Sequence, residues 1–146
     1  MERKDFLKLC GGSCLGLIGI SVFTESCSPT HYVQAVVNNN TIQVAKAEFI
    51  VLKNDTSNFR KYLIVKTDKL DFPIVVYRNS DTSYTALLMM CTHQGVELSV
   101  NGDILTCSAH NSEFNNKGEI IQGPADQRLR LFPVTTDEKN IYLQLF

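Results

Sequence analysis

The sequence predicts an all-β fold, an antiparallel β sandwich, and three observations support this prediction. Short runs rich in Val, Ile, Tyr and Phe recur along the chain, and turn residues separate them. No window from residue 28 onward keeps a helical apolar stripe over about twelve residues. Short strands at regular spacing are typical of small sandwiches and barrels. Residues 28–146 therefore suit one small domain with a single core.

Seven runs are expected to form the strands of the sandwich. They lie at 33–37, 48–52, 62–66, 74–78, 84–90, 129–134 and 141–146. Between 91 and 125 Gly, Asn, Ser and Pro become frequent, and a short hairpin, 96–100 with 103–106, replaces the longer apolar runs. We therefore expect a domain at 33–146 with a small subdomain, about 91–125, inserted between its strands.

Residues 1–26 predict an export signal peptide or a membrane anchor. An apolar run at 9–23 follows a cationic start, and as a helix it spans about 22 Å, short of the roughly 30 Å hydrocarbon core. The stretch 3–8 resembles a twin-arginine export signal with Lys in place of the second Arg. The stretch 24–27 resembles a lipoprotein cleavage box, which makes Cys27 a candidate lipidation site and 27–32 a tether.

Both interpretations of the N-terminal segment place the domain outside the cytoplasm. It is expected on the periplasmic side of a bacterial cytoplasmic membrane or in the cell envelope, held there by a lipid or by the N-terminal anchor. The formal net charge is −1, and no Lys/Arg-rich run occurs. This charge favours neither a nucleic-acid partner nor binding to an anionic membrane surface through charge.

The cysteines and histidines beyond the tether gather in two short motifs. Cys91 and His93 form a Cys-x-His motif, and Cys107 and His110 form a Cys-x-x-His motif. A hairpin between the motifs brings its two ends next to each other in space. Two thiolates and two imidazoles can therefore converge on one centre.

Several chemistries use such residues. Tetrahedral zinc accepts two thiolates and two imidazoles, and so does a 2Fe-2S cluster. A disulfide between Cys91 and Cys107 is the default in an oxidising compartment, but it leaves the histidines unexplained. A thiol enzyme would use one of the cysteines as nucleophile and one of the histidines as base. Finger-type zinc sites usually group the cysteines together and the histidines together, whereas each motif here carries one of each.

This interleaving resembles the Rieske iron-sulfur proteins. Residues 91–95 resemble the first Rieske box, Cys-x-His-x-Gly, and 107–110 resemble the second, Cys-x-x-His. The likeness covers roughly residues 70–146 and extends past the boxes to Ser112, Phe114, Gly118 and the Gly-Pro-Ala stretch at 123–125. It implies a Rieske-like sandwich that carries one 2Fe-2S cluster per chain, with Cys91 and Cys107 on one iron and His93 and His110 on the other.

The resemblance also implies how the surroundings tune the cluster. Ser112 matches the serine whose hydroxyl donates to a cluster sulfur, whereas Phe114 stands where the high-potential members have a tyrosine. Val96 and the pair 108–109 occupy the places of the disulfide that joins the two loops in those members, so that disulfide is not expected. We therefore expect the cluster to have an intermediate reduction potential, within the family span of about −150 to +300 mV.

The expected function is one-electron transfer. The chain would serve as a free-standing carrier or as a small subunit of a membrane-associated redox complex, with a redox protein or a larger oxidoreductase subunit as partner. Gln94 replaces the apolar residue that shapes the quinol-docking surface of related subunits. A quinol is therefore a less well supported partner. Ring-hydroxylating oxygenases match less well because they need a separate non-haem iron domain. No catalytic residue or independent substrate site is predicted.

Overall fold

The computed structural model describes residues 30–53 and 56–146 and confirms the all-β prediction. The export signal at 1–26, the lipidation site Cys27 and the first part of the tether lie outside the described residues. Within the described ranges, no helix has the length and hydrophobicity needed to cross a bilayer. The elements of this part are the strands β1 (Tyr32–Gln34), β2 (Val37–Asn38), β3 (Thr41–Ala45), β4 (Ile50–Lys53), β5 (Thr56–Phe59), β6 (Tyr62–Lys66), β7 (Ile74–Arg78), β8 (Tyr84–Leu88), β9 (Leu98–Asn101), β10 (Ile104–Cys107), β11 (Glu113–Asn115), β12 (Ile120–Gln122), β13 (Leu131–Phe132), β14 (Val134–Thr136) and β15 (Asn140–Gln144), with one 3-10 helix, η2 (Lys46–Phe49).

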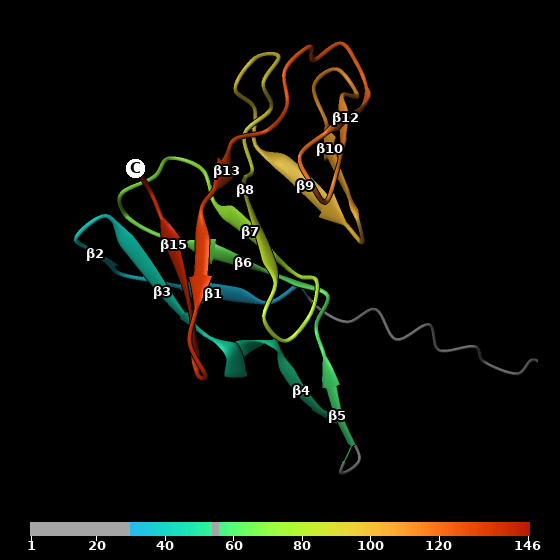
Figure 1. Cartoon of the computed structure of the whole chain (residues 1–146). Helices are drawn as coiled ribbons and strands as arrows, with labels where there is room; N and C mark the ends of the chain where they lie inside the picture. The colour runs from blue at the N-terminus through green and yellow to red at the C-terminus, as the bar shows by residue number, and fades with distance from the viewer. Residues whose placement is uncertain (1–29, 54–55) are drawn as a thin grey trace, which may run out of the picture.

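The strands form three larger sheets and one separate hairpin (Figure 1). The central sheet has the order β1-β6-β7-β8-β13, and a second sheet has the order β14-β15-β3-β2. A third sheet, β12-β11-β10-β9, is a meander of consecutive strands, and β4 pairs with β5 alone. Pairing is antiparallel except between β1 and β6, which run parallel.

The central sheet is buried on both faces, which explains its continuous apolar strands. Along β7, Ile74 and Val76 pack into one core cluster, while Val75 and Tyr77 pack into another. Because successive side chains of a strand point to opposite faces, this alternation places one core on each side of the sheet. The first core is shared with β3 and β15, and the second lies under the β9–β12 sheet. The β9–β12 sheet is therefore held against the sandwich by a core of its own.

The observed strand bounds differ from the prediction where polar residues or turns interrupt the apolar pattern. The runs 62–66 and 74–78 are strands over the predicted residues, and the hairpin 96–106 moves by one to two residues to β9 and β10. The predicted strand 48–52 begins in the helix η2 and becomes β4 only at Ile50. The strands β3, β5, β11, β12 and β14 were not predicted as separate elements. β3 shows the expected alternation, with Ile42 and Val44 buried, but it follows directly on the Asn-rich turn.

Gly118 gives a stability prediction. Its φ of +76° lies in the left-handed region, and an added Cβ would meet Leu87 Cδ2 at 2.9 Å and Leu129 Cβ at 3.2 Å. Gly118→Ala is therefore expected to lower the free energy of unfolding by about 2–4 kcal/mol, through backbone strain and overpacking together. Urea unfolding followed by circular dichroism measures this change.

Gly102→Ala is the matched control, since Gly102 has a similar φ of +60° but open space around the added Cβ. Gly102→Ala should lower the free energy of unfolding by only about 1–2 kcal/mol, because it introduces backbone strain without overpacking. Equal losses for the two variants would contradict the packing argument at Gly118.

Candidate metal centre

The two cysteine motifs lie in loops that share one backbone frame. In the first loop Cys91 N–H donates to Val96 O, and Gly95 N–H donates to Cys91 O, both at 2.8 Å. In the second loop Cys107 N–H donates to Ser112 O, and Asn111 N–H donates to Cys107 O, both at 2.9 Å. Each cysteine thus closes its own loop through the fourth and fifth residues after it. The loops connect β8 to β9 and β10 to β11.

The fourth residue after each cysteine has a positive φ, +66° at Gly95 and +59° at Asn111. Glycine adopts this conformation without steric cost, and asparagine is among the few other residues that tolerate it. The sequence therefore supports the same tight turn in both loops with different residues. Each turn encloses one histidine, two residues after the cysteine in the first loop and three in the second.

The thiols and the imidazoles form two distinct pairs. Cys91 and Cys107 are each 1% exposed and belong to the core under the β9–β12 sheet. His93 and His110 are exposed, and their ring centroids are 4.9 Å apart with the rings edge to face at 86°. The structure thus brings together the four predicted ligands as a buried sulfur pair and a surface imidazole pair.

Local hydrogen bonds favour the thiolate form of Cys107. Burial raises the pKa of this thiol, but the N–H groups of Ala109 and His110 and the Cys91 thiol donate to its sulfur, and the net pKa is lowered. A thiolate is the form that binds metal. The two N–H groups were not foreseen from the sequence, because any residue supplies them and only the loop conformation directs them at the sulfur.

A third segment, 123–127, is bonded to both loops. Ser112 is fully buried, and its Oγ accepts a hydrogen bond from Ala125 N–H at 3.0 Å. Thr92 Oγ1 donates to Gln127 O at 2.6 Å. The segment begins with a cis peptide bond between Gly123 and Pro124. In this bond the Ser112 oxygen is the acceptor, so the bond does not use the hydroxyl proton of Ser112.

The ligand set fits a centre with two metal ions better than a single ion. A structural zinc site needs all four ligands around one ion. Two thiols on one side and two imidazoles on the other instead match a 2Fe-2S cluster whose irons differ in their ligands. The zinc interpretation therefore finds no support.

The disulfide and the thiol enzyme find no support either. Cys91 and Cys107 are free thiols, so the structure contains no disulfide between them. Their burial also argues against a thiol enzyme, because a nucleophilic thiol has to be reached by its substrate. His31 Nε2 lies 2.7 Å from Glu48 Oε2, so this histidine pairs with a carboxylate rather than joining the two loops.

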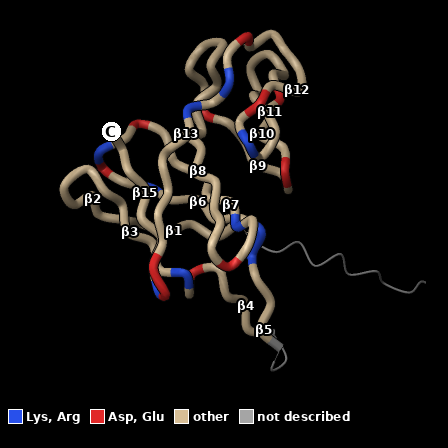
Figure 2. The backbone as a smooth tube through the Cα atoms, in the orientation of Figure 1, with Lys and Arg blue, Asp and Glu red and all other residues tan. Residues whose placement is uncertain are grey.

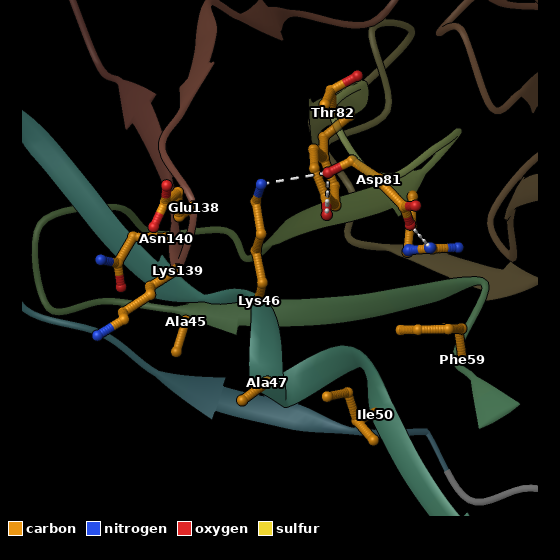
Figure 3. Close-up of a pocket in the computed structure, with 12 residues that line it drawn as sticks. Ala45, Lys46, Ala47, Ile50, Phe59, Asp81, Thr82, Glu138, Lys139 and Asn140 are labelled. Carbon is orange, nitrogen blue, oxygen red and sulfur yellow. Dashed lines mark hydrogen bonds and ion pairs between the residues drawn. The ribbon is translucent and has the colours of Figure 1, made fainter. Parts of the chain in front are cut away.

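A large cavity lies away from the cysteine loops. Its volume is about 730 Å³, and none of the predicted ligands lines it (Figure 3). Its walls come from β3, η2, the β4–β5 hairpin and the turns before β8 and β15. This cavity is therefore separate from the predicted metal centre, which the two cysteine loops form.

Taken together, the fold and the two loops define a β protein that holds a metal-sulfur centre close to its surface. The sequence profile of the Rieske [2Fe-2S] domain matches residues 48–133, which is more than half of the chain. The chain therefore belongs to the Rieske domain family, and its cofactor is a 2Fe-2S cluster.

Individual relatives agree with this assignment. The iron-sulfur subunit of the cytochrome b6-f complex from a Synechococcus species is 32% identical over 75 residues, which cover 50% of this chain and 44% of that protein. The corresponding subunit from Chlorobaculum tepidum is 29% identical over 150 residues and covers 99% of this chain and 76% of that protein. Among solved structures, the cyanobacterial plasma membrane Rieske protein PetC3 from Synechocystis PCC 6803 has a TM-score of 0.50 at 25% identity, with 57% of this chain and 86% of that chain covered. The match thus spans less than half the length of the Synechococcus relative.

Ser112 gives a testable prediction for the redox potential. Its hydroxyl is expected to donate to a cluster sulfur and to favour the reduced form, so Ser112→Ala should lower the midpoint potential. A hydrogen bond worth about 1 kcal/mol corresponds to roughly 40 mV for one electron. Spectroscopic redox titration measures the shift. Ser108→Ala is the control, because Ser108 is exposed in the same loop and its loss should leave the potential unchanged. Equal potentials for the wild type and Ser112→Ala would remove the serine from this role.

Proposed function

We propose that the protein is a one-electron carrier that works through its Rieske cluster, either free-standing or as a small subunit of a membrane-associated redox complex. The observation that carries this proposal is the pair of exposed imidazoles beside two buried thiols. A bound 2Fe-2S cluster supplies reversible one-electron chemistry near the surface. The relatives support this role, since two of them are named as iron-sulfur subunits of the cytochrome b6-f complex.

In this proposal the four ligands divide their roles by burial. Cys91 and Cys107 hold one iron, and their position in the core keeps water away from the thiolates. His93 and His110 hold the other iron at the surface. A histidine that binds a metal through one ring nitrogen keeps the other for a hydrogen bond. The exposed rings can therefore offer that nitrogen to solvent or to a partner protein.

The two cysteine loops themselves carry no charged side chain. Residues 91–96 and 107–112 contain no Lys, Arg, Asp or Glu, and the loops are correspondingly tan in Figure 2. The nearest charges in sequence to the segment that is bonded to both loops are Asp126 and Arg128, one of each sign, so a protein partner would meet a mainly uncharged surface with a charged border. Gln94 is exposed in the first loop and gives this surface a polar side chain. For this reason we favour a redox protein or a larger oxidoreductase subunit over a quinol.

The N-terminal segment would place this carrier at a membrane. The apolar run 9–23 and the box at 24–27 support a tether through an anchor or through a lipid on Cys27, on the periplasmic side of the cytoplasmic membrane or in the cell envelope. The similarity to a plasma membrane Rieske protein supports the association with a membrane.

Electron paramagnetic resonance of the dithionite-reduced full chain, purified without air, tests the proposed function. The expected result is a rhombic signal of the mixed histidine and cysteine type, together with equal amounts of iron and acid-labile sulfide. A silent sample that contains one zinc and no sulfide would overturn the electron-transfer function.

A further inference from the structure

The β4–β5 hairpin presents an apolar face that no other strand of the described chain covers. Ile50 pairs with Phe59, and Leu52 pairs with Ser57, so the side chains of Ile50, Leu52 and Phe59 point to the same side of the hairpin. They are 40%, 81% and 52% exposed, respectively. The two strands form a sheet of their own, separate from the larger sheets. We call the three side chains the hairpin face.

The hairpin face continues into the large cavity. Ile50 and Phe59 line it together with Ala45 and Ala47, so its floor is mainly apolar (Figure 3). The charged residues around it are Lys46, Arg78, Lys139, Asp81 and Glu138. Lys46 Nζ donates to the Asp81 backbone oxygen, and Arg78 packs over the Phe59 ring at 4.0 Å. An apolar floor with charged groups around it suits an amphipathic occupant better than a water-soluble one.

Two features indicate that this occupant is lipid. The hairpin lies at the end of the molecule opposite the loops that carry the predicted cluster ligands (Figure 1). The bond between His31 and Glu48 fixes the start of the described chain beside η2, immediately before β4. The 29 residues before Thr30, which include the apolar run 9–23, therefore join the domain at the base of the hairpin. A membrane tether in those residues would keep a bilayer within reach of the hairpin face.

We propose that the hairpin face and the adjoining cavity contact the bilayer surface, with Leu52 and Phe59 inserted among the lipids. This contact rests on the membrane tether of the proposed function, and it is apolar, in keeping with a net charge of −1. It orients the domain so that His93 and His110 face away from the membrane. The tether then limits how far the domain can move from the membrane. The hairpin face limits how far the domain can rotate relative to the membrane surface.

The chain contains no tryptophan, so a single introduced tryptophan reports its own surroundings. Leu52→Trp and Phe59→Trp each replace an exposed apolar side chain, which should leave the fold intact. The full chain is mixed with vesicles of phosphatidylcholine and phosphatidylglycerol, with brominated phosphatidylcholine as the quencher. Both variants should show a blue shift of their emission and lose most of their intensity to the brominated lipid. Phe146→Trp is the control, since Phe146 is 85% exposed at the C-terminal end, away from the hairpin, and its emission should not change.

Flotation of the same samples separates the hairpin contact from the tether. Protein that floats with vesicles while both hairpin variants stay unshifted and unquenched would overturn the contact and leave the tether standing. Protein that does not float would overturn both. A blue shift without vesicles that grows with protein concentration would assign the hairpin face to a second copy of the chain and also overturn the lipid contact.

Discussion

Cys107→Ala is expected to abolish cluster assembly. Cys107 is 1% exposed, and its sulfur accepts from the N–H groups of Ala109 and His110, so these donors face a thiolate in the assembled site. Alanine leaves the donors without an acceptor and one iron without a ligand. Changes in the groups around metal ligands already lower metal affinity about 10- to 100-fold, and loss of a ligand itself should exceed this. Iron and sulfide per chain, measured after anaerobic purification, should fall to background.

His31→Ala provides the control for this loss. It also removes a metal-binding residue type, but His31 is paired with Glu48 and lies outside the two loops. Its iron and sulfide content should equal that of the wild type. Full iron content in Cys107→Ala would contradict the ligand assignment, and reduced iron content in His31→Ala would point to a ligand that the two loops do not contain.

Phe114→Ala is expected to destabilise the domain more than Gly118→Ala does. Phe114 is fully buried and lies in the core between the β9–β12 sheet and the central sheet, together with Leu87, Leu105 and Leu129. Removing a buried aromatic ring costs about 3–5 kcal/mol because the lost burial and the cavity add together. Since this core also contains both predicted cysteine ligands, Cys91 and Cys107, the variant should bind its cluster less firmly.

Urea unfolding followed by circular dichroism measures the effect of Phe114→Ala. Phe146→Ala removes the same ring from a position that is 85% exposed and should change the free energy of unfolding by less than about 0.5 kcal/mol. If the two variants lost similar stability, Phe114 would not be the packing link between the two sheets.

The fold class could be predicted because the central strands are continuously apolar. β6 and β7 are buried on both faces, so their sequences stand out from the turns around them, and their bounds were found. β12 could not be found in this way, because all its residues are exposed and only its pairing with β11 makes it a strand. The helix η2 carries no strong signal in four residues, so the predicted strand 48–52 started too early.

The ligand types and their spacing were visible in the sequence, whereas the frame that arranges them was not. Two cysteines and two histidines in matched motifs are rare enough to suggest one centre. The matching bonds at Gly95 and Asn111, and the bond from Ala125 to Ser112, depend on backbone conformations that several sequences can adopt. A glycine and an asparagine in equivalent positions do not look alike in sequence, although both tolerate a positive φ.

The pairing of β3 with β15 has a consequence for the order of folding. The hydrogen bond from Thr41 to Gln144 joins residues 103 positions apart, whereas β9 to β12 pair only with their neighbours along the chain. Contacts between distant residues carry a larger loop-closure entropy and form late in folding. We therefore expect the β9–β12 meander, which carries Cys107 and His110, to form early and the sandwich to close last, when β15 inserts beside β3. A newly made chain would then present two of its four predicted iron ligands before the rest of the domain is complete.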